Sequence, residues 1–320
     1  HFNQSVLLRL PKGSDPARVA RALAALESRH ESLRLRFGID ADGQPWQKIA
    51  SEVATPALAV HAFTGKDAAQ RMHEEINRVQ RSLLPESGPI WHAAMFRLDD
   101  GNRLLLTIHH WAVDGVSWRI ILEDLTSAHA QAGNPQATIK LPEVSQSFHD
   151  WSLALRDAAP HFMAQVDYWQ RQMSAEVGTL PKLAQASAAA LHERLILDFT
   201  LPPDKTKALF GDCHGAYRTR SDELLLAAWV RALTTVQGHP SCRLVLESHG
   251  RDALSETIDV SRTVGWFTAI YPLVFTLEGG DWSGHIRQVK ETLRAVPGHG
   301  IGYGLLRYLA QAPGLSGRTG

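Results

Sequence analysis

The apolar positions in the first half of the chain alternate between strand-like runs and helical stripes. Residues 5–10 fit a strand, and Pro16 lies at the start of the helical stripe that follows. Residues 90–98 and 104–108 fit two further strands, and the Asp-Asp-Gly-Asn turn at 99–102 predicts that they pair as an antiparallel hairpin. We therefore expect an α/β fold in which residues 104–108 form a buried strand.

The second half resumes this alternation after a stretch that lacks apolar periodicity. Residues 174–190 are rich in small side chains, so we place a boundary between two lobes there, at 1–175 and 176–320. Further strands and helices are expected at 195–199, 242–246 and 270–275 and from Pro203, Ser221 and Asp281 onward. The side chains that the helix from Ser221 is expected to bury are Leu225, Ala228, Trp229 and Ala232.

Two adjacent histidines, His109 and His110, follow the strand at 104–108. Neighbouring side chains of a strand point to opposite faces, so only one imidazole can face a given cavity. One histidine is therefore a candidate reagent and the other a candidate support. Adjacent histidines diverge and no third ligand lies at a familiar spacing, so no metal site is expected. The alternative is that both histidines are structural.

A tight loop and a helix follow the histidines. We expect Asp114 and Gly115 to form the turn and Ser117 to cap the helix, although Asp114 could itself be only a cap. The apolar stripe of this helix consists of Trp118, Ile121, Leu122 and Leu125. A buried carboxylate needs a partner, and the strand expected at 33–37 places Arg34 and its neighbour Arg36 on one side as candidates.

A second candidate reagent, Glu247, lies at the end of the strand expected at 242–246. Acidic side chains are depleted from strand interiors, and a carboxylate at a strand end beside Gly250 is common in functional sites. The alternative is a structural ion pair of Glu247 with Arg251 or Arg262.

Composition narrows the class of protein. The 320 residues are 44% hydrophobic, enough for two cores. The 33 basic and 33 acidic side chains cancel, so neither nucleic acid nor a membrane is expected as a partner. Cys213 and Cys242 lack metal or redox spacing, and no apolar run is long enough to span a membrane, so we expect free thiols and a cytoplasmic location. Both ends look internal, so we expect the chain to be part of a longer one.

Seven segments together resemble the epimerization domain of nonribosomal peptide synthetases, a branch of the condensation-domain superfamily. They are RHESLRLRF, HHWAVDGVSW with the HHxxxDG signature, DYW, DELLLAA, LESHGRD, RTVGWFTAIYP and PGHGIGYG. HHxxxDG is shared by several acyltransferases, whereas LESHGRD with the last two segments is similar to the epimerizing branch. The resemblance covers residues 5–309. The chain departs from the family pattern at Ser248, where glycine is usual, and at Asp252, where glutamate is usual.

The resemblance implies two lobes like chloramphenicol acetyltransferase, arranged in a V with a tunnel between them. The first lobe would carry HHxxxDG, and the second would carry Glu247 and the RTVGWF segment. His110 and Glu247 correspond to the family's catalytic groups, and Asp114 to its structural aspartate with Arg34 as partner. His109 and Gly115 are further expected supports of the site. The candidate substrate channel consists of Trp118, Tyr217, Trp266 and Tyr271.

The reaction that the resemblance implies is inversion of the Cα of an aminoacyl or peptidyl thioester. The substrate would be tethered to the phosphopantetheine arm of a peptidyl carrier protein, and a downstream condensation domain would be a further partner. A thioester stabilises an adjacent carbanion as an enolate, so the domain itself is expected to need no cofactor. The alternatives are amide-bond formation, as in condensation domains, and a non-catalytic module that docks carrier proteins.

Overall fold

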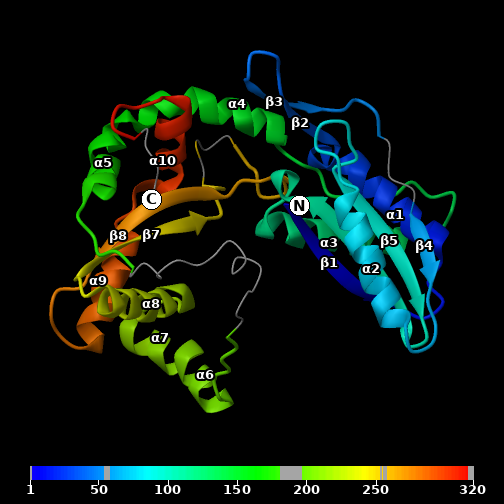
Figure 1. The fold of residues 1–320 in the computed structure, drawn as a ribbon. Coiled ribbons are helices and arrows are strands. Elements are labelled where there is room, and N and C mark those ends of the chain that lie inside the picture. Colours follow the sequence, from blue (N-terminus) through cyan, green and yellow to red (C-terminus); the bar gives the residue numbers. More distant parts are fainter. Residues whose placement is uncertain (1, 54–57, 181–196, 253, 255–257, 316–320) are drawn as a thin grey trace, which may run out of the picture. The chain divides into compact units, whose positions relative to one another are not determined.

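The structure, a computed structural model, describes residues 2–53, 58–180, 197–252, 254 and 258–315. The chain forms two compact units (Figure 1). Unit 1 contains residues 1–157 and 251–268, and unit 2 contains residues 158–250 and 269–320. This division corrects the expected one, because the RTVGWF segment belongs to unit 1, with HHxxxDG, and residues 158–175 belong to unit 2.

The main sheet of unit 1 has four strands in the order β1-β6-β5-β4. These strands are β1 (Asn3–Leu10), β4 (Ala59–Ala62), β5 (Trp91–Leu98) and β6 (Gly101–His109). Strand β6 pairs antiparallel with both β1 and β5, which confirms the predicted hairpin. The short strand β4 lies parallel to β5 at the edge and was not predicted. A separate two-stranded sheet pairs β2 (Leu35–Ile39) with β3 (Pro45–Ile49).

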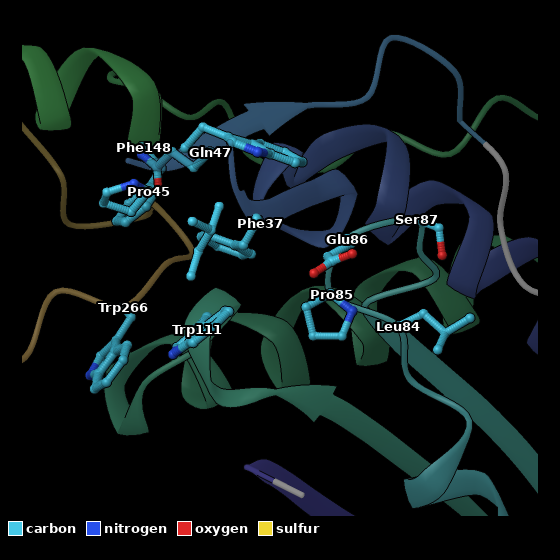
Figure 2. A pocket seen from close by; sticks show the side chains of 13 residues that line it. Phe37, Pro45, Gln47, Leu84, Pro85, Glu86, Ser87, Trp111, Phe148 and Trp266 are labelled. Carbon is cyan, nitrogen blue, oxygen red and sulfur yellow. The ribbon is translucent and has the colours of Figure 1, made fainter. Parts of the chain in front are cut away.

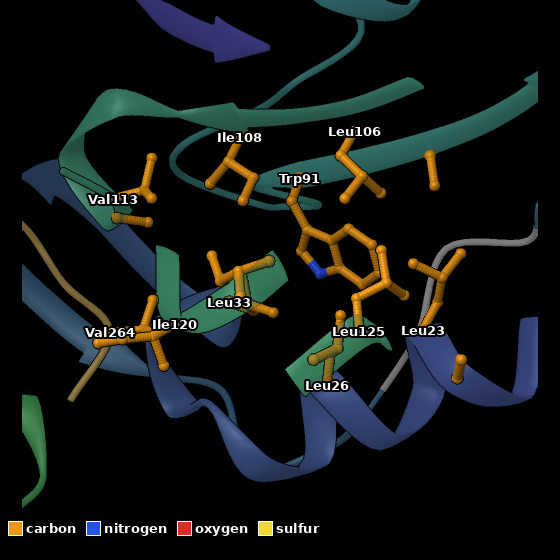
Figure 3. Close-up of a cluster of buried hydrophobic side chains, with 14 of the residues drawn as sticks. Leu23, Leu26, Leu33, Trp91, Leu106, Ile108, Val113, Ile120, Leu125 and Val264 are labelled. Carbon is orange, nitrogen blue, oxygen red and sulfur yellow. The ribbon is translucent and has the colours of Figure 1, made fainter. Parts of the chain in front are cut away.

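Both faces of this sheet are covered, which explains why β6 is apolar at successive positions. Leu106 and Ile108 pack into a core with α1 (Pro16–Arg29) and α3 (Gly115–Gln131), around the buried indole of Trp91 (Figure 3). Leu105 points to the opposite face and joins a smaller cluster with Val79 of α2 (Ala68–Arg81). Because side chains alternate along a strand, a strand buried on both faces reads as a continuous apolar run.

Unit 2 is built on the antiparallel pair β7 (Ser241–Ser248) and β8 (Ala269–Thr276). Its core surrounds Trp169 and includes Tyr271 of β8 and Tyr303. The helices of unit 2 are α5 (Val166–Ser174), α6 (Pro203–Phe210), α7 (Asp212–Tyr217), α8 (Ser221–Gln237), α9 (Trp282–Arg294) and α10 (Ile301–Gly304). Unit 2 also contains two short 3-10 helices, η3 (Ala159–Gln165) and η5 (Pro297–Gly300), and a short π-helix, η6 (Leu305–Leu309). Helix α4 (Phe148–Ala158) precedes this unit.

Two predictions for unit 2 need correction. Helix α8 buries Glu223, Leu224, Ala227 and Val230, whereas Leu225 and Trp229 of the predicted stripe are 49% and 57% exposed. This helix is apolar on most sides, so its periodicity does not determine which side faces the core. The strand predicted at 195–199 lies partly outside the described residues, and residues 197–199 are not in a strand.

Candidate functional site

The histidine pair lies where β6 ends and the single turn η2 (His110–Ala112) begins. His109 is buried, and its Nδ1 accepts a hydrogen bond of 3.3 Å from the backbone N–H of Trp111. Burial and the neighbouring His110 lower the pKa of His109. A neutral imidazole that already accepts a backbone hydrogen bond is suited to support the turn and not to move protons.

His110 has a different environment. Its ring is half-buried and stacks on Phe2, with ring centroids 4.8 Å apart, and Trp266 lies 4.9 Å away at a tilt of 44°. The Nε2 atom lies 2.9 Å from the side-chain nitrogen of Gln4. The Nδ1 atom is buried and has no hydrogen-bond partner among the described residues. Of the two histidines, His110 therefore has the ring nitrogen that the local fold leaves unused.

Asp114 caps helix α3 and is buried at 2% exposure. Its Oδ1 accepts the N–H of Ser117 at 2.7 Å, and its Oδ2 accepts the N–H of Phe267 at 3.1 Å. Helix α3 thus begins at Gly115, and Ser117 is not the cap. The turn does not require glycine at position 115, because its φ is not left-handed and an added Cβ would meet nothing within 4 Å.

The ion-pair partner of Asp114 is Arg251, with Nη2 3.2 Å from Oδ1. Both side chains are buried, and the guanidinium stacks over the Phe267 ring at 3.9 Å. Burial lowers the pKa of Arg251, and the Asp114 carboxylate opposes this shift. An arginine buried in this way needs its carboxylate partner, because desolvation of either charge alone is costly.

The expected pairing of Arg34 with Asp114 is wrong. Arg34 ends the single turn η1 (Glu31–Arg34) and does not lie in β2. Its guanidinium donates to the carbonyls of Glu27 and Ala50, so it joins the end of α1 to the end of β3. The alternative that Arg251 or Arg262 pairs with Glu247 is also not observed, since Arg262 binds Asp124 at 2.5 Å.

Ser117 has a larger role than the sequence suggested. Its hydroxyl donates to the carbonyl of Gly265 at 2.9 Å and accepts the N–H of Gly265 at 3.1 Å. It also lies 3.0 Å from Nη2 of Arg251. Asp114 and Ser117 together therefore bind Arg251, Gly265 and Phe267 to the start of α3. The only sequence signal for this role is that Asp114 and Ser117 lie next to the apolar stripe of helix α3.

Gly265 is required by close packing. A Cβ at this position would lie 2.3 Å from the ring of Phe148, a distance that no ordinary contact allows. The next residue, Trp266, contacts His110 as described, so the packing of Gly265 also places an indole beside the candidate reagent.

A pocket of about 610 Å³ in unit 1 lies beside the histidine turn (Figure 2). Trp111 of η2 and Trp266 form part of its wall, and Phe37 of β2 contacts Trp111 with ring centroids 5.2 Å apart. Most of the other lining side chains are apolar, among them Ile39, Pro45, Trp46, Leu84, Pro85 and Phe148. Such walls suit an uncharged group.

Glu247 lies near the end of β7, opposite Ile270 of β8, and lines a pocket of about 660 Å³ in unit 2. Its side chain is exposed, and its carboxylate has no hydrogen bond or ion pair among the described residues. Tyr271 lines the same pocket, whereas Tyr217 does not. The four expected channel residues are therefore divided, with Trp118 and Trp266 near His110 in unit 1, Tyr271 near Glu247 and Tyr217 elsewhere in unit 2.

The PGHGIGYG segment supports this second pocket. Gly300 has a φ of +90°, and a Cβ there would lie 1.9 Å from the ring of Tyr271. His299 lines the pocket beside it. Glycine is thus needed for both its backbone conformation and its closeness to Tyr271.

Two features are absent from the described part of the chain. It contains no group of three His, Cys, Asp or Glu side chains placed to hold a metal ion. None of its helices has the length and apolarity needed to cross a membrane.

Comparison with known proteins identifies the class. The model of the condensation-domain family matches residues 1–319, and the chain belongs to this family. It is 36% identical over 315 residues to surfactin synthase subunit 1 of Bacillus subtilis and 32% identical over 329 residues to bacitracin synthase 2 of Bacillus licheniformis. The matches cover 97% and 98% of this chain but only 9% and 12% of those two proteins.

Solved structures agree with the family assignment. The epimerization domain from the third module of tyrocidine synthetase B has a TM-score of 0.86 and 35% identity, covering 97% of this chain and 70% of that one. The first condensation domain of the calcium-dependent antibiotic synthetase has a TM-score of 0.72 at 19% identity, covering 94% and 70%. The second likeness shows the fold alone. Both structures support a condensation-domain fold for this chain.

Proposed function

We propose that this domain epimerizes the Cα of an aminoacyl or peptidyl thioester bound to a peptidyl carrier protein, with His110 and Glu247 as the acid/base pair. The observation that carries the proposal is Glu247, an exposed carboxylate in a pocket of unit 2 with no hydrogen bond or ion pair among the described residues. A second support is sequence identity. The chain is 35% identical to the epimerization domain of tyrocidine synthetase B and only 19% identical to the condensation domain compared above.

Inversion of a carbon centre is best served by two acid/base groups. A single base returns a proton to the face from which it took it, so inversion needs a second group for the opposite face. His110 offers an imidazole and Glu247 offers a carboxylate, the two kinds of side chain that most often transfer protons in enzymes. Positioned acid and base groups contribute about 10²–10⁴ each to the rate.

The ion pair of Asp114 with Arg251 connects the HHxxxDG motif to the LESHGRD segment, which contains Glu247. Arg251 is fixed in unit 1 beside the turn that carries His110, and Glu247 precedes it by four residues. The proposed reaction requires both groups to act on one Cα.

The proposal includes the substrate tether and excludes a cofactor bound by the domain. The thioester on a phosphopantetheine arm acidifies the Cα proton, so the side chains need only remove and return a proton. The partners that we propose are a carrier protein and a condensation domain of the same cytoplasmic synthetase. The relatives support this assembly, because both are named as synthases or parts of them and are many times longer than this chain.

A direct test uses the full-length protein that carries this domain. A panel of L-aminoacyl thioesters on a peptidyl carrier protein is incubated with it in deuterated water, and the acyl group is then released and analysed. We expect a mixture of D and L forms with deuterium at Cα. Retention of the L form with hydrogen at Cα across the panel would reject the proposal.

A parallel reaction with loaded donor and acceptor carriers tests the alternative. The match to the condensation-domain model favours amide formation as the second candidate function. A new amide without Cα exchange would establish it. Carrier binding with neither reaction would instead identify a docking module.

A further inference from the structure

The side-chain amide of Gln4 bridges two aromatic residues of unit 1. Gln4 lies on β1, opposite Ile108 of β6, and is partly buried. Its oxygen lies 2.7 Å from Nε1 of Trp118, and its nitrogen lies 2.9 Å from Nε2 of His110. An indole N–H can only donate, so the amide oxygen must face Trp118. The orientation of the amide is therefore fixed by chemistry.

This orientation determines what His110 can do at Nε2. The amide nitrogen only donates, so Nε2 must accept and cannot carry a hydrogen in this arrangement. The hydrogen of the neutral ring then lies on Nδ1. A doubly protonated ring would place an N–H against the N–H₂ of Gln4. Reversing the amide would place its N–H₂ against the N–H of Trp118, so neither orientation suits an imidazolium.

We propose that Gln4, held by Trp118, is a positioning residue that selects the Nδ1–H tautomer of His110. Protonation at Nε2 requires the amide to leave its present position and to give up the hydrogen bond with Trp118. The bridge thereby couples the charge of His110 to the rotamer of Gln4. The tautomer itself is independent of the reaction, whereas its catalytic consequence rests on the proposed epimerization.

The rings around His110 strengthen this effect. Phe2 stacks on the imidazole with an interplanar angle of 13°, and Trp266 packs against it. Neither Phe2 nor the indole face of Trp266 can replace a lost hydrogen bond, and the Nδ1 atom has no partner among the described residues. Gln4 therefore provides the hydrogen bond that decides between the two tautomers.

Three variants separate the possible roles of the bridge. Gln4→Glu replaces the donor with an acceptor of the same shape, so Nε2 should carry a hydrogen. Gln4→Met removes the hydrogen bond and should return the ring to the tautomer preference of an unconstrained imidazole. Trp118→Phe frees the amide to rotate and should give a mixture of tautomers. Gln136→Glu, in an exposed turn after α3, makes the same charge change elsewhere and serves as the control.

The measurement is nitrogen NMR of the full-length protein with labelled histidine, with His110 assigned by the loss of its signals in His110→Gln. We expect Nε2 without hydrogen and Nδ1 with hydrogen in the wild type, and the reverse in Gln4→Glu. Hydrogen on Nε2 of the wild type would overturn the proposal, as would an unchanged tautomer in both Gln4→Glu and Gln4→Met. Reading the wild type alone decides the matter if a variant does not fold.

Cα exchange supplies the second readout. We expect Gln4→Glu to slow exchange at neutral pH by about tenfold or more, within the range of a positioned acid/base group, and Gln136→Glu to leave it unchanged. The expected tautomers with no exchange by the wild type would reject epimerization and leave the bridge standing. Exchange by the wild type with hydrogen on Nε2 would reject the bridge and leave epimerization standing.

Discussion

The carboxylates of Asp114 and Glu247 represent two opposite uses of an acidic side chain. Asp114 is buried and accepts from two backbone N–H groups and from Arg251. Glu247 is exposed in a pocket and has no such partner among the described residues. A carboxylate whose lone pairs are occupied holds structure, whereas one whose lone pairs are open can exchange protons. The HHxxxDG aspartate therefore belongs to the scaffold, and of the two carboxylates only Glu247 suits the acid/base role that we propose.

The largest expected effect comes from breaking the buried ion pair. Arg251→Met leaves the carboxylate of Asp114 buried without its charged partner, and such a loss costs about 3–5 kcal/mol. The free energy of unfolding of unit 1, measured by urea titration, should fall by this amount.

An exposed ion pair of the same helix provides the control. Arg119 is 73% exposed and lies 4.0 Å from Glu123, so Arg119→Met should cost less than about 1 kcal/mol. Equal losses in the two variants would show that Asp114 and Arg251 do not form the scaffold described above.

A smaller effect is expected from the packing of the segment that Asp114 and Ser117 hold. Gly265→Ala introduces a methyl group 2.3 Å from the Phe148 ring and should destabilise the fold by about 1–3 kcal/mol. Gly115→Ala adds the same group where nothing lies within 4 Å and should cost nothing. The melting temperatures of the two variants are compared by thermal unfolding, and an unchanged melting temperature of Gly265→Ala would contradict the tight packing of Gly265 against Phe148.

The corrected partner of Asp114 predicts a still smaller effect at position 34. Arg34 only donates to two backbone carbonyls, so Arg34→Met should lower the free energy of unfolding by about 1 kcal/mol. A loss as large as that in Arg251→Met would contradict this smaller role of Arg34. The same urea titration measures both.

Strand β7 contains the same contrast between its two ends. Cys242 near its start is fully buried, and burial raises the pKa of this thiol, while Glu247 at the other end is exposed. A thiol with a raised pKa has a smaller fraction of reactive thiolate near neutral pH. Cys242 should therefore react with a thiol reagent more slowly than the half-buried Cys213. Labelling followed by mass spectrometry measures both sites, and faster labelling of Cys242 would contradict its burial.

Local signals were sufficient for much of the fold. The hairpin of β5 and β6 followed from two apolar runs around an Asp-Asp-Gly-Asn turn, and α1 followed from a helical stripe that starts at Pro16. The buried side of α8 did not, because apolar side chains on most of its sides left the choice to tertiary packing.

The site contains contacts that local sequence patterns do not predict. His110 and Glu247 stand out in the sequence because each lies at the end of a strand. Arg251 lies 137 residues from Asp114, and nothing in the local pattern distinguishes it from Arg34 as a partner. Gln4 lies 106 residues from His110, and a glutamine on a strand carries no signal of its role. Long-range hydrogen bonds of this kind become visible only when the strands are paired.

Cα exchange by Glu247→Gln is the measurement that tests the central contrast most directly. The full-length wild type and variant are given an L-aminoacyl carrier thioester in deuterated water, and their unfolding midpoints are compared in parallel. We predict that the variant keeps the midpoint of the wild type, since Glu247 has no partner to lose among the described residues, and that it no longer incorporates deuterium at Cα. Wild-type exchange in a stably folded Glu247→Gln variant would contradict the account.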